Sequence, residues 1–287
     1  MKLITLIENT SETEKLQIEN GISFYVEHAG ANFVIDFGAS DRLMKNASKM
    51  QINLSRLSFA VLTRNDDTCT GGAYAVIRAN PGIKLFAQRE VKNDYYINSG
   101  VFTVPNGLPV KFFDKYADHF VLYNTFQQCA ANGKYVDGVY LMTAEYYDER
   151  WSSREKSSLV RHGGKYIKDD LYADSFCVIF PGEEKDGCII VAPAARTGLP
   201  NIVATVRENW VNVNVLAIIC GFEMAGKTQK HLNCSPDFCA ETADALRRLN
   251  VGQIYACHST GQRAYDVMKE TLSSQLQYLR TGEMLEF

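Results

Sequence analysis

One loop of this sequence gathers acidic, basic and thiol side chains between a predicted strand and a predicted helix. It reads Leu-Thr-Arg-Asn-Asp-Asp-Thr-Cys-Thr-Gly-Gly over residues 62–72. The apolar run from Phe59 to Leu62 predicts a buried strand, and the glycine pair opens a segment with helical spacing. Carboxylates and thiols bind metals, whereas a guanidinium binds anions or carboxylates. The contents of this loop therefore decide whether the site is a zinc centre or only has the frame of one.

Two later loops repeat the same local pattern. Cys69-Thr70-Gly71, Arg196-Thr197-Gly198 and Ser259-Thr260-Gly261 each follow a predicted strand and open a segment with helical spacing. Repeated strand-loop-helix units predict helices on the outside of two packed sheets, an α/β sandwich. The carboxyl ends of the strands and the first turns of the helices would then meet at one edge. Such an edge favours ligands, and anions in particular, because helix N–H groups point into it.

The composition is that of an ordinary globular protein. The chain has 287 residues, of which 46% are hydrophobic and 22% charged, with 30 Lys and Arg against 33 Asp and Glu. This near balance gives no electrostatic reason to expect nucleic acid or a membrane surface as a partner. The apolar run at the amino terminus is too short for a signal peptide, and no stretch reaches the length of a membrane span. We therefore expect a cytoplasmic protein, and the sequence does not predict its oligomeric state.

Hydrophobic periodicity predicts most of the secondary structure at the two ends of the chain. We expect strands over residues 2–8, 22–28, 32–36, 59–64, 83–88, 176–180, 188–191, 213–220 and 254–257. We expect helices over 41–50, 71–79, 199–209, 236–249 and 262–272. The middle is harder to interpret: 110–113 and 139–142 are rich in β-forming residues, and 148–170 has the composition of a long surface loop.

The eight cysteines are expected to be reduced, because nothing in the sequence directs export. Four of them lie in or beside apolar runs, where a thiol behaves as a small hydrophobe: Cys129, Cys177, Cys188 and Cys220. Cys234 and Cys239 form a pair with four residues between them, but no second pair lies at zinc-ribbon spacing. A structural zinc is therefore not expected there.

The segment from Gly221 to Thr228 matches the phosphate-binding pattern G-x-x-x-x-G-K-[ST] and follows a hydrophobic strand. A P-loop runs directly into a long helix whose first turn holds the phosphates. Here the next residues, Gln229 to Ser235, have no amphipathic pattern and lead to Pro236. We interpret the match as chance.

Several landmarks in order resemble the metallo-β-lactamase superfamily, in particular its branch of dihydropterin ribofuranosyl-aminobenzene phosphate synthases. The matching segments are Ile22-Ser23-Phe24 (branch pattern G-[LI]-S-F), Val34 to Gly38 (F-D-T-G), Asn46-Ala47, Leu62 to Gly72 (L-S-H-x-H-x-D-H-T-G-G), Val191 to Asn201 (V-T-G-C-x-H-x-G-I-x-N), Gly221 to Glu223 (G-G-F-H) and Cys257 to Gly261 (C-H-C-T-G). The resemblance covers nearly the full length. It implies a single-domain, four-layer αββα sandwich over residues 1–287, and it accounts for the P-loop match as an altered G-F-H loop.

The same resemblance shows where the metal ligands of the family are missing. The positions of the H-x-H-x-D-H motif hold Arg64, Asp66, Thr68 and Cys69, and the histidines of the next two motifs are Arg196 and Glu223. His258 alone is retained. Zinc needs neutral imidazoles, thiolates or carboxylates at about 2 Å, and arginine stays protonated. We therefore expect the dinuclear zinc site to be absent.

Three interpretations of this site remain. In the first, Arg64 and Arg196 form salt bridges with acidic residues and fill the vacated space; the candidate partners are Asp36, Asp66, Asp67 and Glu223. In the second, the two guanidiniums hold a phosphate or carboxylate. In the third, a rebuilt site keeps hydrolase or transferase activity, with one zinc, iron or manganese ion on Asp66, Cys69 and His258, or with Cys69 as nucleophile and His258 as base.

The sequence prediction is a degenerate protein of this fold without a resident metal, which binds a small anionic molecule. The candidate ligand-binding residues are Arg64, Asp66, Asp67, Arg196, Glu223 and His258. The alternative is an active metal-dependent hydrolase or transferase, for which Cys69 and His258 are the catalytic candidates. A lone histidine at a strand end is more often structural than a ligand.

Overall fold

The computed structural model describes residues 1–145, 147–169 and 174–287 and contains two seven-stranded sheets. The first sheet has the strand order β18-β1-β2-β3-β4-β5-β8. Strands β3, β4, β5 and β8 are parallel, and the others pair antiparallel. The bounds are β1 Lys2–Ile7, β2 Ser23–His28, β3 Ala31–Ile35, β4 Phe59–Leu62, β5 Leu85–Gln88, β8 Phe120–Tyr123 and β18 Met284–Glu286.

The second sheet has the strand order β17-β16-β15-β14-β13-β10-β9. Strands β14 to β17 run parallel, so their carboxyl ends lie at one edge. The bounds are β9 Phe126–Ala131, β10 Lys134–Thr143, β13 Ser175–Ile179, β14 Gly187–Ala192, β15 Asn214–Cys220, β16 Gln253–Ala256 and β17 Leu276–Tyr278.

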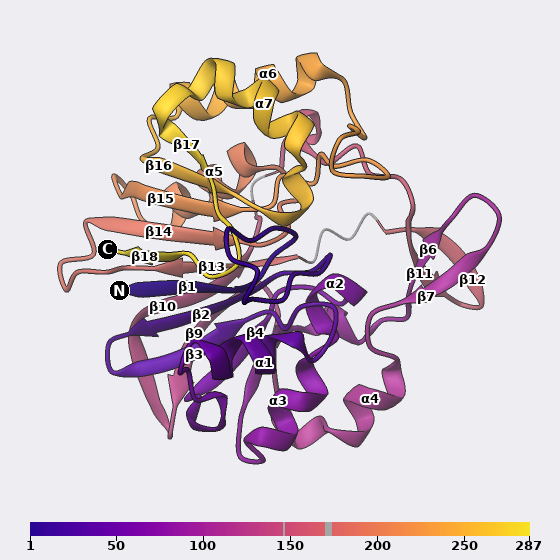
Figure 1. Ribbon diagram of the computed structural model, residues 1–287, viewed down its shortest axis with the longest axis vertical. Helices are drawn as coiled ribbons and strands as arrows, with labels where there is room; N and C mark the ends of the chain where they lie inside the picture. The colour runs from indigo at the N-terminus through magenta and orange to yellow at the C-terminus, as the bar shows by residue number, and fades with distance from the viewer. Residues whose placement is uncertain (146, 170–173) are drawn as a thin grey trace.

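Helices cover the outer face of each sheet (Figure 1). The helices on the first sheet are α1 Arg42–Lys49, α3 Ala73–Ala79 and α4 Val110–Lys115, with the single turn α2 Asp67–Thr70 beside the strand ends. Those on the second sheet are α5 Leu199–Asn209, α6 Pro236–Arg248 and α7 Gln262–Leu272. Within the described ranges, no helix has the length and hydrophobicity that a membrane crossing requires.

Side-chain alternation along the second sheet separates two hydrophobic cores. Along β13 and just beyond it, Phe176, Val178 and Phe180 pack with the helices α5, α6 and α7. Cys177 and Ile179, which point the other way, pack against the first sheet. Both faces of this sheet are therefore buried, and the helix-sheet-sheet-helix order confirms the predicted αββα sandwich.

A third, four-stranded sheet projects from the sandwich (Figure 1), and the sequence analysis did not predict it. Its order is β12-β11-β6-β7, with the bounds β6 Tyr95–Asn98, β7 Thr103–Asn106, β11 Ser158–His162 and β12 Lys165–Lys168. The expectation of a long loop over 148–170 was therefore wrong for much of that segment. Residue 170 lies outside the described residues. Gly163 and Gly164, with φ of 55° and 81°, form the tight turn that joins β11 to β12.

The prediction of a β-type run over 110–113 was also wrong, because Val110–Lys115 is the helix α4. Its aromatic residues have helical rather than alternating spacing. Phe112 and Tyr116, four residues apart, bring their ring centroids to 4.7 Å, and Phe113 is buried. Packing of these aromatic residues decided the conformation against the local β propensity.

Candidate functional site

Polar residues that follow five strands converge at one edge of the sandwich. Asp36 follows β3 and Arg64 follows β4 in the first sheet, while Arg196, Glu223 and His258 follow β14, β15 and β16 in the second. Arg64 contacts Glu223 across the two sheets. The convergence that the repeated Thr-Gly loops predicted is therefore confirmed by the geometry.

The three Thr-Gly loops need glycine for two different reasons. Gly198 and Gly261 have φ of 88° and 77°, a left-handed conformation that other residues adopt with strain. Gly71 is in the ordinary helical region with φ of −59°, but a Cβ atom there would lie 2.1 Å from the backbone of Ala39. The end of the first loop is thus packed directly on the backbone of Ala39.

Arg64 lies between two carboxylates. Its Nη2 contacts Asp66 Oδ2, and its Nη1 lies 3.3 Å from Glu223 Oε1. Asp66 also caps the turn α2, since its Oδ1 accepts hydrogen bonds from the N–H groups of Thr68 and Cys69 at 2.8 and 3.1 Å. Two of the partners that the first interpretation named for Arg64 are therefore in place.

Arg196 lies among two other carboxylates. Its Nε and Nη2 each lie 2.6 Å from an oxygen of Asp174, which is the bidentate geometry of a strong ion pair. Its Nη1 donates to Asp169 Oδ2 at 2.5 Å. Burial alone would lower the pKa of Arg196, but the charges of Asp174 and Asp169 outweigh it and hold that pKa well above its ordinary value. Arg196 is a permanent cation.

Asp169 and Asp174 are site residues that the sequence analysis missed. Strands β13 and β14 are antiparallel, with Cys177 opposite Val191. Extending that register by three residues places Asp174 opposite Ala194, close to Arg196. Strand pairing could therefore have indicated Asp174, whereas Asp169 enters from the small sheet that was not predicted.

His258 is held by contacts with the two residues that follow β1. Its Nδ1 lies 3.0 Å from Asn9 Oδ1, and its backbone N–H donates to Glu8 Oε1 at 2.7 Å. Its φ of 45° is left-handed. Burial, together with the charge of Arg64, lowers the pKa of His258 to about 3, so the imidazole is neutral. Glu8 and Asn9 carried no signal in the sequence analysis.

Asp36 and Cys69 are neighbours at the bottom of the same edge. The Asp36 carboxyl accepts from the Thr63 N–H and hydroxyl at 2.8 and 2.6 Å, and burial raises its pKa to about 7. Burial also raises the pKa of the Cys69 thiol well above its ordinary value. A protonated thiol is a weak nucleophile. Along the described parts of the chain, no hydrogen bond joins Cys69 to His258, so the geometry does not form a cysteine-histidine pair.

Asp67 lies apart from the two arginines, although the sequence analysis grouped it with them. Its Oδ1 accepts from the N–H of Gly107 at 2.8 Å, and its own N–H donates to Asn106 Oδ1 at 3.0 Å. Asp67 therefore ties the turn α2 to the strand end of the small sheet.

The guanidiniums of Arg64 and Arg196 border one small cavity of about 20 Å³. This volume holds about one water molecule. The cavity walls come from the loop after β4, from the small sheet and from the ion pairs; they are Arg64, Asn65, Asp66, Val91, Tyr95, Tyr96, Asn106, Ser158, Asp169, Asp174 and Arg196. The small sheet thus forms one side of this cavity at the edge of the sandwich.

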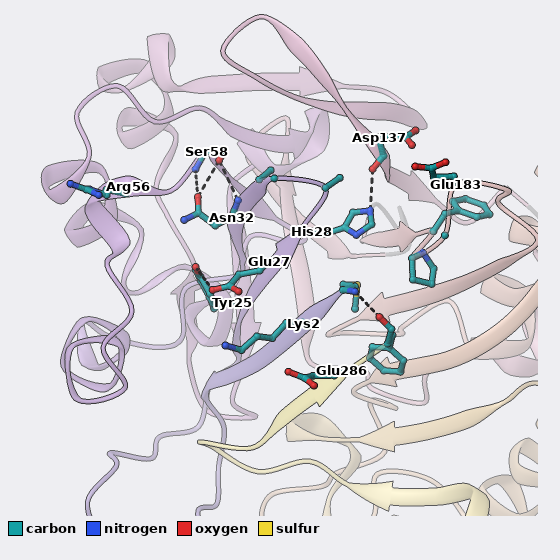
Figure 2. Close-up of a pocket in the computed structure, with 18 residues that line it drawn as sticks. Lys2, Tyr25, Glu27, His28, Asn32, Arg56, Ser58, Asp137, Glu183 and Glu286 are labelled. Atoms are coloured by element: carbon teal, nitrogen blue, oxygen red, sulfur yellow. Dashed lines mark hydrogen bonds between the residues drawn. The ribbon is translucent and has the colours of Figure 1, made fainter.

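A wider groove of about 1100 Å³ lies elsewhere (Figure 2). It is bordered by the turn between β2 and β3, by the ends of β1 and β18, and by residues 180–183. Because it lies at the start of β3 and Asp36 lies after its end, the groove is at the opposite end of that strand from the candidate site. The candidate site residues do not line it.

The side chains at the candidate site do not fit a dinuclear metal centre. Two of the positions carry guanidiniums, which stay protonated and have no lone pair to donate. Asp66 and Glu223 are engaged by Arg64, and Asp169 and Asp174 by Arg196. Over residues 1–145, 147–169 and 174–287, no three His, Cys, Asp or Glu side chains form a group suited to a metal ion.

The chain is similar over its full length to solved structures of one superfamily. A metal-dependent hydrolase of the β-lactamase superfamily, Tm1679, matches with a TM-score of 0.80 and 19% identity, over 100% of this chain and 99% of that one. The metallo-β-lactamase fold protein YhfI from Bacillus subtilis matches with a TM-score of 0.58 and 9% identity, over 100% and 99%. This chain has the metallo-β-lactamase fold.

A comparison of sequences gives a second full-length similarity. No family model matches the chain. The 7,8-dihydropterin-6-methyl-4-(β-D-ribofuranosyl)-aminobenzene-5′-phosphate synthase of Methanocaldococcus jannaschii is 21% identical over 100% of this chain and 97% of its own length. The metallo-β-lactamase fold and the branch resemblance that the motifs indicated are thus both supported, and the ligand changes at Arg64, Arg196 and Glu223 distinguish this chain's site from the motif pattern.

Two buried groups of this fold give opposite pH dependences of stability. Asp36 has a folded pKa of about 7 against an ordinary 3.8, so its contribution to stability is lost as pH rises from about 4 to 7. His258 has a folded pKa of about 3 against 6.5, so its contribution is lost as pH falls from about 6.5 to 3. Between about pH 4 and 6.5 the two effects oppose each other.

We expect single variants to separate these effects in urea unfolding at pH 4.5 and 6.5. Asp36→Asn removes the contribution of Asp36 and leaves that of His258. From pH 4.5 to 6.5, the unfolding free energy of this variant should therefore rise relative to that of wild type by roughly 2 to 3 kcal/mol. His258→Asn should show the reverse slope, and asparagine tolerates the left-handed backbone there. Identical slopes in wild type and both variants would mean that neither group is held in the stated protonation state.

Proposed function

We propose that this chain is a metal-independent binding protein for a small phosphate- or carboxylate-bearing ligand, held between Arg64 and Arg196. The observation that carries the proposal is that buried N–H donors of the Arg64 guanidinium lack hydrogen bonds. Its Nε is buried without a hydrogen-bond acceptor among the described residues, and its buried Nη1 faces Glu223 Oε1 at 3.3 Å without forming a hydrogen bond. Burying guanidinium donors without acceptors is costly, and an anionic oxygen at the cavity would supply the acceptors.

The balance of charges sets how such a ligand must bind. Two guanidiniums lie among four carboxylates, so the site has no spare positive charge. Asp169 is the carboxylate most easily replaced, because only one of its oxygens contacts Arg196 and the other, Oδ1, has no partner among the residues described. Asp174 holds Arg196 through both oxygens. A ligand anion would therefore take the place of Asp169 on Arg196.

The small sheet would set the size of the ligand. Tyr95 and Tyr96 of β6 and Ser158 of β11 form one wall of the cavity. Asp169 directly follows β12 of the same sheet. Displacement of Asp169 and enlargement of the cavity are thus parts of one movement, in which the small sheet shifts away from the arginines.

An enzyme with a rebuilt metal site is the second candidate. Its support is the full-length similarity to a named synthase and to a metal-dependent hydrolase. It requires Asp66, Cys69 and His258 to form a metal site, which means that Asp66 must leave Arg64 and His258 must leave Asn9. Metal content separates the two candidates.

Titration with inorganic phosphate tests the binding proposal. We expect a thermal shift in wild-type protein and binding about tenfold tighter in Asp169→Asn, because a competing charged hydrogen bond is removed. Arg64→Gln should lose most of the shift. The matched control is Arg247→Gln, since Arg247 pairs with Asp244 on the exposed face of α6 and should leave the shift unchanged. The proposal is wrong if neither wild type nor Asp169→Asn responds, or if Arg64→Gln responds as strongly as wild type.

A further inference from the structure

The cysteine pair in the loop before α6 has no part in the ion-pair site, yet its two sulfur atoms are close. Cys234 Sγ lies 3.6 Å from Cys239 Sγ. A disulfide has an S–S bond of about 2.05 Å, so the sulfur atoms need to approach by only about 1.5 Å. Cys234 precedes the N-cap residue Ser235 and Cys239 lies in the first turns of the helix, so a small movement of the loop is sufficient.

The two thiols differ in access, which is the arrangement of a reactive thiol and a resolving thiol. Cys234 is partly exposed and Cys239 is buried. The hydrogen bond from Cys239 and the nearby charge of Arg154 lower the pKa of Cys234, although its partial burial opposes them. Arg154 is held beside the pair, with its guanidinium 4.7 Å from the ring centre of Phe238. The six other cysteines are buried.

We propose that Cys234 and Cys239 are a reversible dithiol site that reacts with low-molecular-weight disulfides. The Cys234 thiolate attacks one sulfur of the small disulfide, forming a mixed disulfide and releasing one small thiolate. The Cys239 sulfur, on losing its proton, then attacks the Cys234 sulfur and releases the second small thiolate. Two protein thiols and one small disulfide thus give one protein disulfide and two small thiols, with both protons passing to the released thiolates.

The site is connected to the ion pair of Arg64 through the backbone of its own loop. Asn233, next to Cys234, donates from Nδ2 to the carbonyl oxygen of Glu223 at 2.9 Å and from its N–H to that of Met224 at 3.0 Å. Glu223 has a left-handed φ of 56°, so these contacts hold a conformation that an isolated chain would avoid. Oxidation of the pair would tether this loop to α6 and stabilise the placement of Glu223.

Equilibration of the full chain with glutathione and glutathione disulfide buffers, followed by acid quenching and alkylation, tests the dithiol site. We expect wild type to lose two alkylatable thiols, with the disulfide mapped by mass spectrometry to the peptides of Cys234 and Cys239. Cys239→Ser should stop at the mixed disulfide on Cys234, and Cys234→Ser should stay reduced. Cys129→Ser, which changes a buried cysteine of the first core, should behave as wild type.

A second readout, the melting temperature, tests whether the disulfide stabilises this loop. The oxidised wild type should have a Tm higher than the reduced protein by on the order of 2–4 °C, and Cys234→Ser should show no difference between the two buffers. The inference is overturned if both thiols remain alkylatable across the buffer series, or if the disulfide maps to other cysteines. Neither readout depends on phosphate, so the outcomes of both are independent of the binding proposal.

Discussion

Replacing Arg196 with methionine is expected to lower the free energy of unfolding by roughly 3–5 kcal/mol. The substitution removes a cation that contacts both Asp169 and Asp174, whose side chains are only 2% and 4% exposed. Two buried carboxylates would then repel each other and lack their hydrogen-bond donors. Urea unfolding at pH 7, monitored by circular dichroism, measures the loss.

Two matched variants decide whether the loss comes from uncompensated charge. The triple variant Arg196→Met, Asp169→Asn, Asp174→Asn is neutral at these positions and should recover much of the stability. Arg247→Met, which breaks an exposed ion pair with Asp244, should cost less than about 1 kcal/mol. If Arg196→Met costs no more than Arg247→Met, the buried ion pairs do not stabilise the site.

Adding one methyl group at Gly71 is the second change with a large expected effect. In Gly71→Ala the new Cβ would lie 2.1 Å from the carbonyl carbon and oxygen of Ala39, and backbone atoms cannot move aside as a flexible side chain can. The loop after β4 would have to separate from residues 38–40, which breaks the hydrogen bond from the Gly71 N–H to the Gly38 oxygen at 2.8 Å. We expect a loss above about 3 kcal/mol or failure to fold.

Gly82→Ala provides the control for this prediction. A Cβ at Gly82 meets only the side-chain oxygen of Asn80, at 3.9 Å. Its unfolding free energy should lie within about 1 kcal/mol of the wild-type value. Equal stabilities of Gly71→Ala and Gly82→Ala in urea unfolding would contradict the close packing of the loop.

The sequence was most informative where local patterns decide the structure. The helices α5 and α7 lie over the ranges expected from their apolar spacing, 199–209 and 262–272. Ser235 caps α6 through a hydrogen bond from the Phe238 N–H, as the Ser-Pro-Asp signal indicated. The buried face of each helix and the cap of α6 depend on residues within a few turns of one another. Local sequence patterns were therefore sufficient to predict these helices.

The errors arose where local signals were weak or tertiary packing opposed them. The turn at Gly163-Gly164 is a hairpin signal, but the charged residues around it also fit a loop. The partners of Arg196 are separated from it by 22 and 27 positions in the chain. Only the pairing of two strands could have indicated Asp174, and Asp169 follows a sheet that was not predicted. The partners of Arg64 were predicted better because Asp66 lies in the same loop and Glu223 matched a motif position.

The charged residues at the site differ from the residues that the family motifs place there. Both arginines lie at motif positions where the family has histidines, and each is held by a pair of carboxylates. A cation with hydrogen-bond donors thus lies at each of these two positions. The ion pair of Arg64 with Glu223 joins the strand ends of the two sheets.

Metal content tests the absence of a metal centre most directly. The purified chain would be incubated with zinc, iron or manganese in separate reactions, desalted and analysed by elemental mass spectrometry. We expect less than about 0.1 equivalent of any of these metals, because the arginines cannot ligate and the carboxylates are engaged. About one equivalent or more in wild type, lost in Asp66→Asn or His258→Asn, would contradict a metal-independent site.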